Sequence, residues 1–176
     1  MGIQIRPAAL HDAFDACHVL RRSITESCAI DHQQQPDILQ SWLGNKTPEN
    51  VASWIASPSN YTLVAVRDGQ VVGVALVTQA GKLSLCYLLP GSATCLSIGK
   101  ALLRAVEGQA REWGVSVLRL HSTATARLLR ATTVTCSLTE EKSCYGVECD
   151  FFWKKLNADA SNDQSQSKRF CSCSAQ

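Results

Sequence analysis

The N-terminal third of the chain carries two kinds of apolar pattern. Residues 3–6 alternate between apolar and polar side chains, which predicts a short strand. From Leu10 to Ile24 the apolar residues recur at helical spacing, which predicts an amphipathic helix. The stretch Glu26 to Lys46 begins with polar residues and ends with apolar ones, which predicts a loop that leads into a second short helix. Thr47 followed by Pro48 is typical of an N-cap and a first helical turn, so a third helix is expected to start there.

The middle of the chain consists of apolar runs separated by turn signals. Asp68 and Gly69 form a DG dipeptide, which is a strong hairpin signal, and Gly81 marks a second tight turn. Strands joined by such short connections pair as an antiparallel meander. The predicted strands comprise residues 61–67, 70–79 and 83–89.

The strongest helical pattern of the chain follows this meander. Apolar residues from Ile98 to Trp113 lie on one face of a helix, and Gly114 is typical of its end. Residues 115–120 then form an almost continuous apolar run, which is typical of a buried strand. Because strand, helix and strand follow one another, the two flanking strands are expected to pair in parallel. The sequence therefore predicts a mixed sheet.

The apolar pattern weakens after His121. Residues 123–131 favour a helix, and residues 132–138 and 146–154 favour two closing strands. From residue 157 onward Ser, Asn, Asp and Gln dominate, which is typical of a disordered tail. We therefore expect one folded domain over residues 1–156 and a disordered segment over residues 157–176.

Composition changes this predicted fold little, but it limits the classes of partner that the chain can bind. With 45% apolar and 18% charged residues, the chain falls within the ordinary globular range. A net charge of +2, spread along the chain, provides no basic patch for nucleic acid or for an anionic membrane surface. No apolar run reaches the roughly 18 residues that a membrane span needs, and the N-terminus lacks the apolar core of a secretory signal. These features predict a cytoplasmic protein that acts on a small molecule or a peptide.

The cysteines do not fit a disulfide framework. Their number, nine, is odd, and most of them lie in predicted helices or strands. Cys17, Cys86 and Cys149 are therefore interpreted as small core residues. No two cysteines have the two-residue gap of a zinc knuckle, so no structural metal is expected.

Three short motifs carry a resemblance to a known family. They are YLLP at residues 87–90, SIGKALL at residues 97–103 and HSTATAR at residues 121–127. Together with the element order over residues 3–156, they make the chain similar to the GNAT superfamily of N-acetyltransferases. The resemblance implies an α/β (α+β mixed) fold, with a mostly antiparallel twisted sheet of about six to seven strands flanked by about four helices. It also implies acetyl-coenzyme A as cosubstrate and an amine, on a small molecule or a peptide, as acceptor.

The start of the long helix is the expected site for the cofactor phosphates. First-turn amides have no partner within a helix, and the helix dipole adds partial positive charge, so an anionic phosphate can bind there. Small residues let the phosphate oxygens approach the backbone. By itself, SIGKALL also fits an ordinary amphipathic helix in which the serine is only an N-cap. The resemblance assigns the site to Thr94, Ser97, Ile98, Gly99 and Lys100.

The strand before this helix is the expected site for the reactive end of the cofactor. In the family, two neighbouring strands splay here, and free backbone groups pair with the pantetheine arm of coenzyme A. The resemblance therefore implies that a backbone N–H at Leu88 or Leu89 stabilises the oxyanion, which is usually a large catalytic effect. Two departures stand beside this match, because Thr94 replaces the family's Arg or Gln and Cys95 replaces its first glycine.

A general base is the next requirement of amine acetylation. An amine with a lysine-like pKa of about 10.4 is almost fully protonated at neutral pH, so a base helps to make it nucleophilic. Glu26, Asp31 and His32 lie in the loop that overlies the acceptor site in the family, and His121 is a further candidate. Each of these also fits an ordinary solvated or structural residue.

The proton donor of the family is replaced in this chain. A tyrosine protonates the departing thiolate in the family, whereas the matching position holds Arg130. Arginine does not donate a proton near neutrality, although it can stabilise a thiolate electrostatically. Tyr145 is the alternative donor.

Codon degeneracy offers a reason for this replacement. RLLRATT can be encoded so that one shifted frame reads GFYE, and TTVTCSL so that another reads NDGYLQF. Joined, the two readings restore the family pattern FYENDGY. We hypothesise that residues 128 to about 139 arose through compensating frameshifts in the gene.

Two functions remain open from the sequence. The first is an N-acetyltransferase in which the amine attacks acetyl-coenzyme A directly, so that no cysteine has to act as a nucleophile. The second is a catalytically impaired relative that binds coenzyme A as a ligand or regulatory module, and Thr94, Cys95 and Arg130 favour it. The sequence identifies neither the acceptor nor the oligomeric state, so a homodimer stays open.

Overall fold

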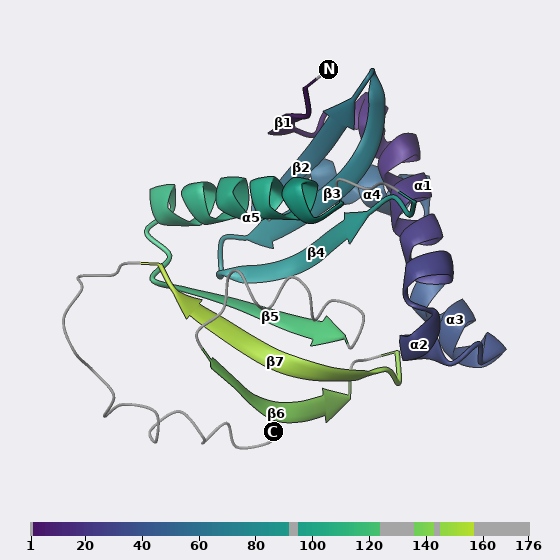
Figure 1. Ribbon diagram of the computed structural model, residues 1–176. Coiled ribbons are helices and arrows are strands. Elements are labelled where there is room, and N and C mark those ends of the chain that lie inside the picture. The colour runs from purple at the N-terminus through teal and green to yellow at the C-terminus, as the bar shows by residue number, and fades with distance from the viewer. Residues whose placement is uncertain (1, 92–94, 124–135, 143–144, 157–176) are drawn as a thin grey trace.

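A seven-stranded sheet forms the centre of the computed structural model, which describes residues 2–91, 95–123, 136–142 and 145–156 (Figure 1). The strands lie in the order β1-β2-β3-β4-β5-β7-β6, and all neighbours are antiparallel except β4 and β5. This arrangement confirms the predicted mixed, mostly antiparallel sheet and its parallel pair. The strands are β1 (Gln4–Pro7), β2 (Asn60–Arg67), β3 (Gln70–Thr78), β4 (Lys82–Leu88), β5 (Val117–Thr123), β6 (Cys136–Lys142) and β7 (Glu148–Lys155).

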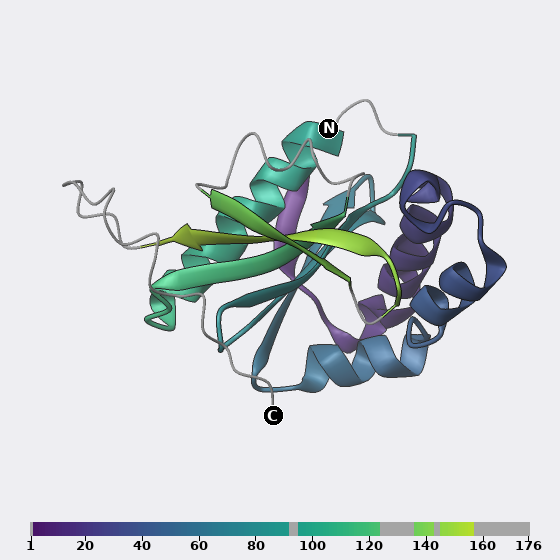
Figure 2. The same ribbon diagram turned by 90° about the horizontal axis from the view of Figure 1, so that it is seen from below.

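Helices cover both faces of the sheet, as Figures 1 and 2 show. α5 crosses one face, whereas α1 and α4 pack on the other. The four longer helices match the prediction of about four, and α2 adds a single turn. The helical elements are α1 (Ala13–Arg22), α2 (Ala29–His32), α3 (Pro36–Leu43), α4 (Pro48–Ala56) and α5 (Cys95–Glu112), with a 3-10 turn at Leu10–Asp12 and a π-helical turn at Ser23–Ser27.

Two hydrophobic cores lie on the two faces of the sheet. Successive side chains of a strand point to opposite faces, so Leu63 and Ala65 pack under α5, whereas Val64 packs against α1. Gly73 on β3 lies beneath α5, and a Cβ there would lie 3.0 Å from Leu102 Cδ1 on α5 and 2.9 Å from Leu88 Cδ2 on β4. Because real Cβ atoms essentially never come so close, glycine permits the tight packing of α5 against the centre of the sheet.

The largest difference from the sequence-based expectation lies in residues 26–46. The predicted loop contains the end of a π-helical turn and α2 before α3 begins at Pro36. Ile24 and Cys28 are buried against Trp42, and this long-range packing favours helical turns where the local polar pattern indicated a loop. The sequence pattern alone does not contain that contact.

Several boundaries move by a few residues, as is usual for element ends. α5 begins at Cys95 rather than near Ser97, and β5 extends to Thr123. The helix predicted over residues 123–131 lies outside the described residues from 124 onward, and so do the predicted tail and most of the strand predicted over 132–138. Within the part of the chain that the structure describes, no helix has the length and apolar character needed to cross a bilayer.

Candidate functional site

The parallel strands β4 and β5 separate shortly after they begin. Within the described residues, their ladder pairs Lys82 with Arg119 and Leu83 with Leu120, whereas β4 stays paired with β3 as far as Leu88. Figure 1 shows the two strands diverging toward the side where α1 and α2 lie. We call this separation, between residues 84–88 of β4 and residues 121–123 of β5, the V. The splaying that the family resemblance implied is therefore present.

The direction of the backbone amides distinguishes Leu88 from Leu89. The N–H of Leu89 donates to the carbonyl of Val72 at 2.8 Å, so this amide extends the ladder with β3. Successive N–H groups along a strand point to opposite edges, so the N–H of Leu88 points into the V. Of the two predicted oxyanion donors, Leu88 therefore has the suitable orientation.

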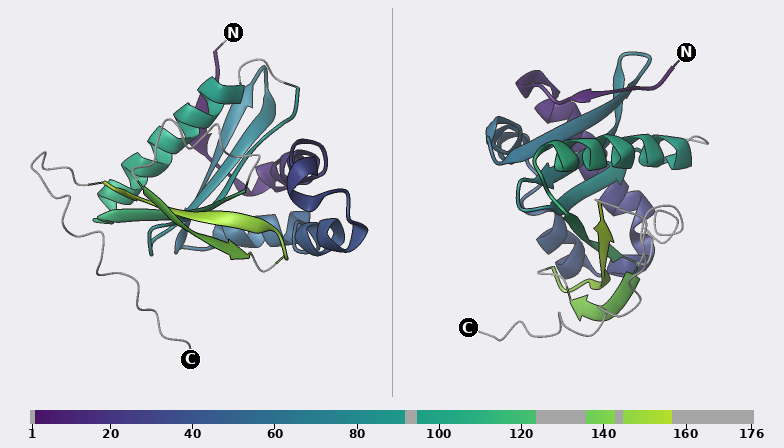
Figure 3. Two further views of the ribbon diagram at one scale, coloured as in Figure 1. Left: turned by 60° about the horizontal axis from the view of Figure 1, so that its bottom comes forward. Right: turned by 90° about the vertical axis from the view of Figure 1, so that its left-hand side faces the viewer.

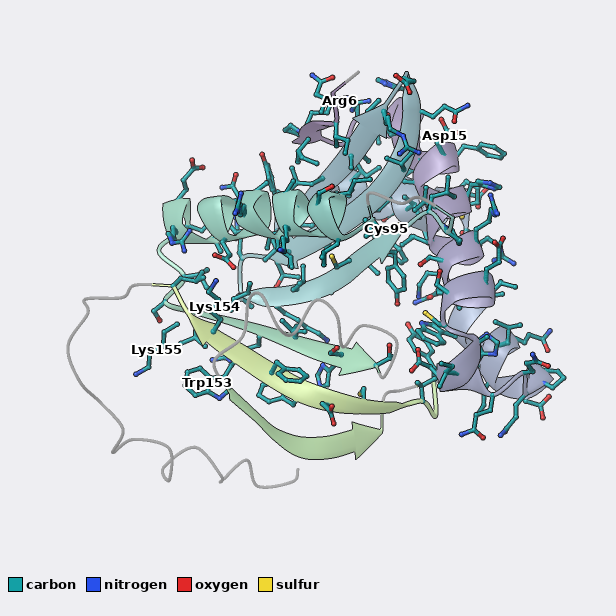
Figure 4. The ribbon with its side chains drawn as sticks, in the orientation of Figure 1. Arg6, Asp15, Cys95, Trp153, Lys154 and Lys155 are labelled. Carbon is teal, nitrogen blue, oxygen red and sulfur yellow. The ribbon has the colours of Figure 1, made fainter. Side chains whose placement is uncertain are left out.

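The start of α5 lies beside the end of β4. The Sγ atom of Cys95 is 3.7 Å from the carbonyl oxygen of Leu89, and Figure 4 shows Cys95 next to that strand end. Because α5 begins at Cys95, the first-turn amides, which no carbonyl of the same helix can accept, are those of Cys95, Leu96 and Ser97. The helix start at which the sequence analysis placed the phosphates thus lies two residues before Ser97.

The other predicted phosphate ligands divide between core and surface. Ile98 is only 1% exposed and packs in the core under α5, and Gly99 is also buried, so these two residues lie on the side of the helix that faces the sheet. Ser97 is exposed and Lys100 is half-buried, which leaves both side chains within reach of solvent. Thr94 lies outside the described residues.

Burial holds two of the thiols, those of Cys28 and Cys86, in the protonated form. Burial raises the pKa of both Cys28 and Cys86 to about 12, and the Asp31 carboxylate beside Cys28 adds to the shift of that thiol. The thiolate is the nucleophilic form of cysteine, so neither residue is activated for covalent catalysis at neutral pH. Cys17 and Cys149 are buried, as the core interpretation predicted, whereas Cys86 is half-buried.

Two of the predicted bases use their acceptor atoms for structural contacts. Glu26 is exposed, and both of its oxygens accept from Arg22, at 2.6 and 2.9 Å. This pairing holds the pKa of Glu26 below its ordinary value, so it stays a paired carboxylate. His32 is 2% exposed, and its Nδ1 accepts from the Gln34 N–H at 3.1 Å.

The remaining catalytic candidates lie in different surroundings. His121 is exposed on β5, with its ring centroid 5.4 Å from that of Phe151. The Asp31 carboxylate lies close enough to Cys28 to help raise the pKa of that thiol. Arg130 lies outside the described residues. The structure thus brings the start of α5 and the end of β4 together, but gathers no catalytic cluster from those candidates that it describes.

An aromatic group beside the V, formed by the buried Trp42 and two partly buried tyrosines, was not predicted from the sequence. Tyr87, on the opposite face of β4 from Leu88, packs against a cluster that contains Trp42. Burial raises the pKa of Tyr87 above its ordinary value. Tyr145 stacks on Trp42 with ring centroids 6.3 Å apart. The alternation in YLLP places Tyr87 opposite Leu88, but no local signal joins Tyr145 to Trp42.

Comparison with known proteins relates this geometry to one family. A sequence model of the acetyltransferase (GNAT) family matches residues 25–131. A search of curated proteins finds no significant match. Among solved structures, a GCN5-related N-acetyltransferase from Rhodopseudomonas palustris is similar with a TM-score of 0.73 and 18% identity, covering 88% of this chain and 96% of that one.

Two further solved structures have the same fold. The PaiA N-acetyltransferase from Thermoplasma acidophilum, in complex with coenzyme A, has a TM-score of 0.69 and 20% identity over 88% of this chain and 99% of that one. The aminoglycoside 6'-N-acetyltransferase from Enterococcus faecium has a TM-score of 0.64 and 12% identity over 92% of this chain and 100% of that one. At such low identities the likeness establishes the fold and not the acceptor.

Proposed function

The chain belongs to the acetyltransferase (GNAT) family, and from this premise we propose that it transfers an acetyl group from acetyl-coenzyme A to an amine by direct attack. The observation that carries the proposal is the V, where β4 and β5 part after Leu83 and the Leu88 N–H points into the gap. Acetyl-coenzyme A supplies an activated thioester, and the residues of this chain bind it, orient it and stabilise the charge that develops.

The backbone groups around the V fit the shape and charge of coenzyme A. The edge of β4 that faces the V is unpaired with β5 beyond Leu83, so an extended arm can add to it as a further strand would. The first-turn amides of α5 and its dipole suit the pyrophosphate, and Lys100 adds a positive charge near that end. Thr94, Ser97, Ile98 and Gly99 complete the proposed phosphate-binding segment.

The Leu88 N–H is the proposed oxyanion donor. Pairing with β3 on the other edge of β4 fixes this amide in place before any substrate binds. A donor that is already oriented requires no reorganisation when the carbonyl oxygen becomes negative, which is why such donors contribute strongly to acyl transfer.

Direct attack is favoured by the state of the thiols. Burial raises the pKa of Cys28 and of Cys86 to about 12, so neither of these two thiols is poised to form an acyl-enzyme. The amine itself then acts as the nucleophile after losing a proton. Glu26, Asp31, His32 and His121 remain the proposed bases, and Arg130 or Tyr145 the proposed group for the thiolate. Loss of the true base changes the shape of the pH profile of kcat/KM, whereas loss of a structural contact only scales it.

Two measurements test this function against its alternative. Calorimetry with acetyl-coenzyme A tests the site, and the absence of binding at millimolar cofactor would refute both an enzyme and a coenzyme A-binding module. Release of free coenzyme A thiol with a panel of amines then separates the two. Turnover with any amine supports the transferase. Binding without turnover favours the coenzyme A-binding module, which the replacement of family residues by Cys95 and Arg130 supports.

A further inference from the structure

The two halves of the sheet that separate at the V are joined again at its open end. One half holds β4 with the N-terminal helices, and the other holds β5, β7 and β6. The segment before β7 lies beside α2 and α3 in the views of Figures 2 and 3. The residues that meet there are Ile24, Cys28 and Trp42 from the first half and Val147 from the second, with Tyr87 and Tyr145 packed against them.

A buried lysine lies at this junction. Lys46 is 3% exposed, and its Nζ donates to Asn45 Oδ1 at 2.5 Å and to the Tyr145 hydroxyl at 3.3 Å. The same Nζ lies 4.9 Å from the centroid of the Tyr145 ring and 5.9 Å from that of Trp54. An ammonium group is costly to bury unless hydrogen bonds and aromatic faces replace its water, and here both are present.

Both ends of this contact are held by other groups. The backbone carbonyl of Lys46 accepts from Arg21 Nη1 at 3.0 Å and from the Cys17 thiol at 3.2 Å, so α1 fixes its position. Tyr145 stacks on Trp42 at an interplanar angle of 16°, and Asn45 Nδ2 donates to its hydroxyl at 3.2 Å. A continuous chain of contacts therefore runs from α1 through Lys46 and Tyr145 to the start of β7.

We propose that Lys46 and Tyr145 form a clamp that sets the separation of β4 and β5 at the open end of the V. The reason is that the ladder between these strands ends at Leu83 and Leu120, so hydrogen bonds between the strands do not fix their spacing beyond that point. The clamp acts on the reaction through Tyr87, which adjoins Leu88, and through β7, which pairs with β5. In the clamp, Lys46 and Tyr145 act as positioning residues, whichever group protonates the thiolate, and their catalytic consequence rests on the proposed function.

Three substitutions isolate the clamp. Lys46→Met removes the charge while keeping an unbranched side chain, and Lys46→Arg keeps a cation that can donate to both partners. Tyr145→Phe keeps the ring on Trp42 and removes the hydroxyl. The matched control is Lys154→Met, because Lys154 also ties β7 to a helix, with its Nζ 2.7 Å from Glu107 Oε1 on α5, but at the opposite end of the strand (Figure 4).

The first readout is affinity for acetyl-coenzyme A, measured by calorimetry. Lys46→Met is expected to weaken binding about tenfold or more, since small displacements of positioning groups have large effects. Tyr145→Phe is expected to weaken it less, Lys46→Arg to restore most of it, and Lys154→Met to leave it unchanged. The effects of Lys46→Met and Tyr145→Phe should not add, because both remove one shared contact.

The second readout is amide hydrogen exchange without any ligand. Lys46→Met should speed exchange in residues 145–150 and 85–88, whereas Lys154→Met should not. This readout separates the clamp from the proposed function. If the wild-type protein binds no acetyl-coenzyme A, the proposed function fails and exchange alone decides the clamp. If Lys46→Met matches the wild type in both affinity and exchange, the clamp is refuted while acetyl transfer stands.

Discussion

The neighbouring residues Leu88 and Leu89 differ in the direction of their backbone N–H groups. Leu89 donates its N–H to Val72, whereas the N–H of Leu88 faces the V. Leu88→Pro therefore removes the oxyanion donor without removing a bond to β3, and we expect kcat to fall about 100-fold or more. Leu89→Pro should instead lower the melting temperature, because it removes the 2.8 Å bond to Val72. Thiol-release assays and thermal unfolding of both variants test this, and equal effects of the two on kcat and stability would contradict it.

The buried carboxylate of Asp12 links β1 to the first helical turn through hydrogen bonds. Both oxygens of Asp12 accept from Arg6, at 2.7 and 2.8 Å, and the Ala9 N–H donates to it at 2.7 Å. Hydrogen bonding to Arg6 holds the pKa of Asp12 below its ordinary value. Its contribution to stability is therefore complete above the ordinary pKa of about 3.9 and is lost as the pH falls through the lower folded value.

Asp12→Asn should reduce the free energy of unfolding by about 2 kcal/mol at neutral pH. The difference from the wild type should shrink below a pH of about 4. Urea unfolding across this pH range measures it. Asp15→Asn, which changes an exposed carboxylate on α1, is the control and should have little effect (Figure 4). A difference between Asp12→Asn and the wild type that persists unchanged in acid would argue against the Arg6 pair as its source.

The gene itself tests the hypothesis about residues 128 to about 139. If compensating frameshifts produced this segment, its codons must encode FYENDGY when read in the shifted frames. A protein rebuilt with that reading should gain acetyl transfer relative to the present chain, because it regains the family's tyrosine in place of Arg130. A nucleotide sequence that cannot encode the pattern would end the hypothesis.

At the scale of elements, one turn fixes the narrow end of the V. Gly81 joins β3 to β4 with φ +78°, and a Cβ there would lie 2.6 Å from the carbonyl oxygen of Val117 on β5. Gly69 has a similar φ of +79°, but a Cβ at Gly69 would meet no atom of the described residues within 4 Å. A substitution at Gly69 therefore tests backbone strain alone, whereas a substitution at Gly81 tests strain and close packing together.

Gly69→Ala should cost about 1 kcal/mol of stability, which is the conformational penalty alone. Gly81→Ala should cost about 3 kcal/mol, because it also displaces the start of β5. Denaturant unfolding gives both values. The close-packing argument would fail if the two variants lost the same stability.

How far each element could be predicted depends on the range of its contacts. α5 and the meander were predicted because their apolar periods extend over many residues and glycines mark the turns. α2 was missed because it is one turn long and has no period of its own. It forms where Cys28 and the preceding Ile24 are buried against Trp42.

At the scale of the whole molecule, binding of acetyl-coenzyme A should stabilise the fold. The proposed site joins β4, α5 and the V, which the unfolded chain does not assemble. At a cofactor concentration of 100 times Kd, the free energy of unfolding should rise by about 2.7 kcal/mol. S-acetylpantetheine, which lacks the phosphates, should stabilise much less, since it cannot use the start of α5. Thermal unfolding with each ligand measures the difference, and equal stabilisation would remove α5 from the proposed site.

The sequence by itself determined the types of the main elements, the mixed sheet and the family. These depend on local periodicity and on short motifs such as SIGKALL, which act over neighbouring residues. Only the tertiary structure decided which leucine amide faces the V, because that depends on which edge of β4 pairs with β3. It alone also raised the pKa of Cys28 and brought Lys46 to Tyr145, because burial and contacts between distant segments exist only after the chain has folded.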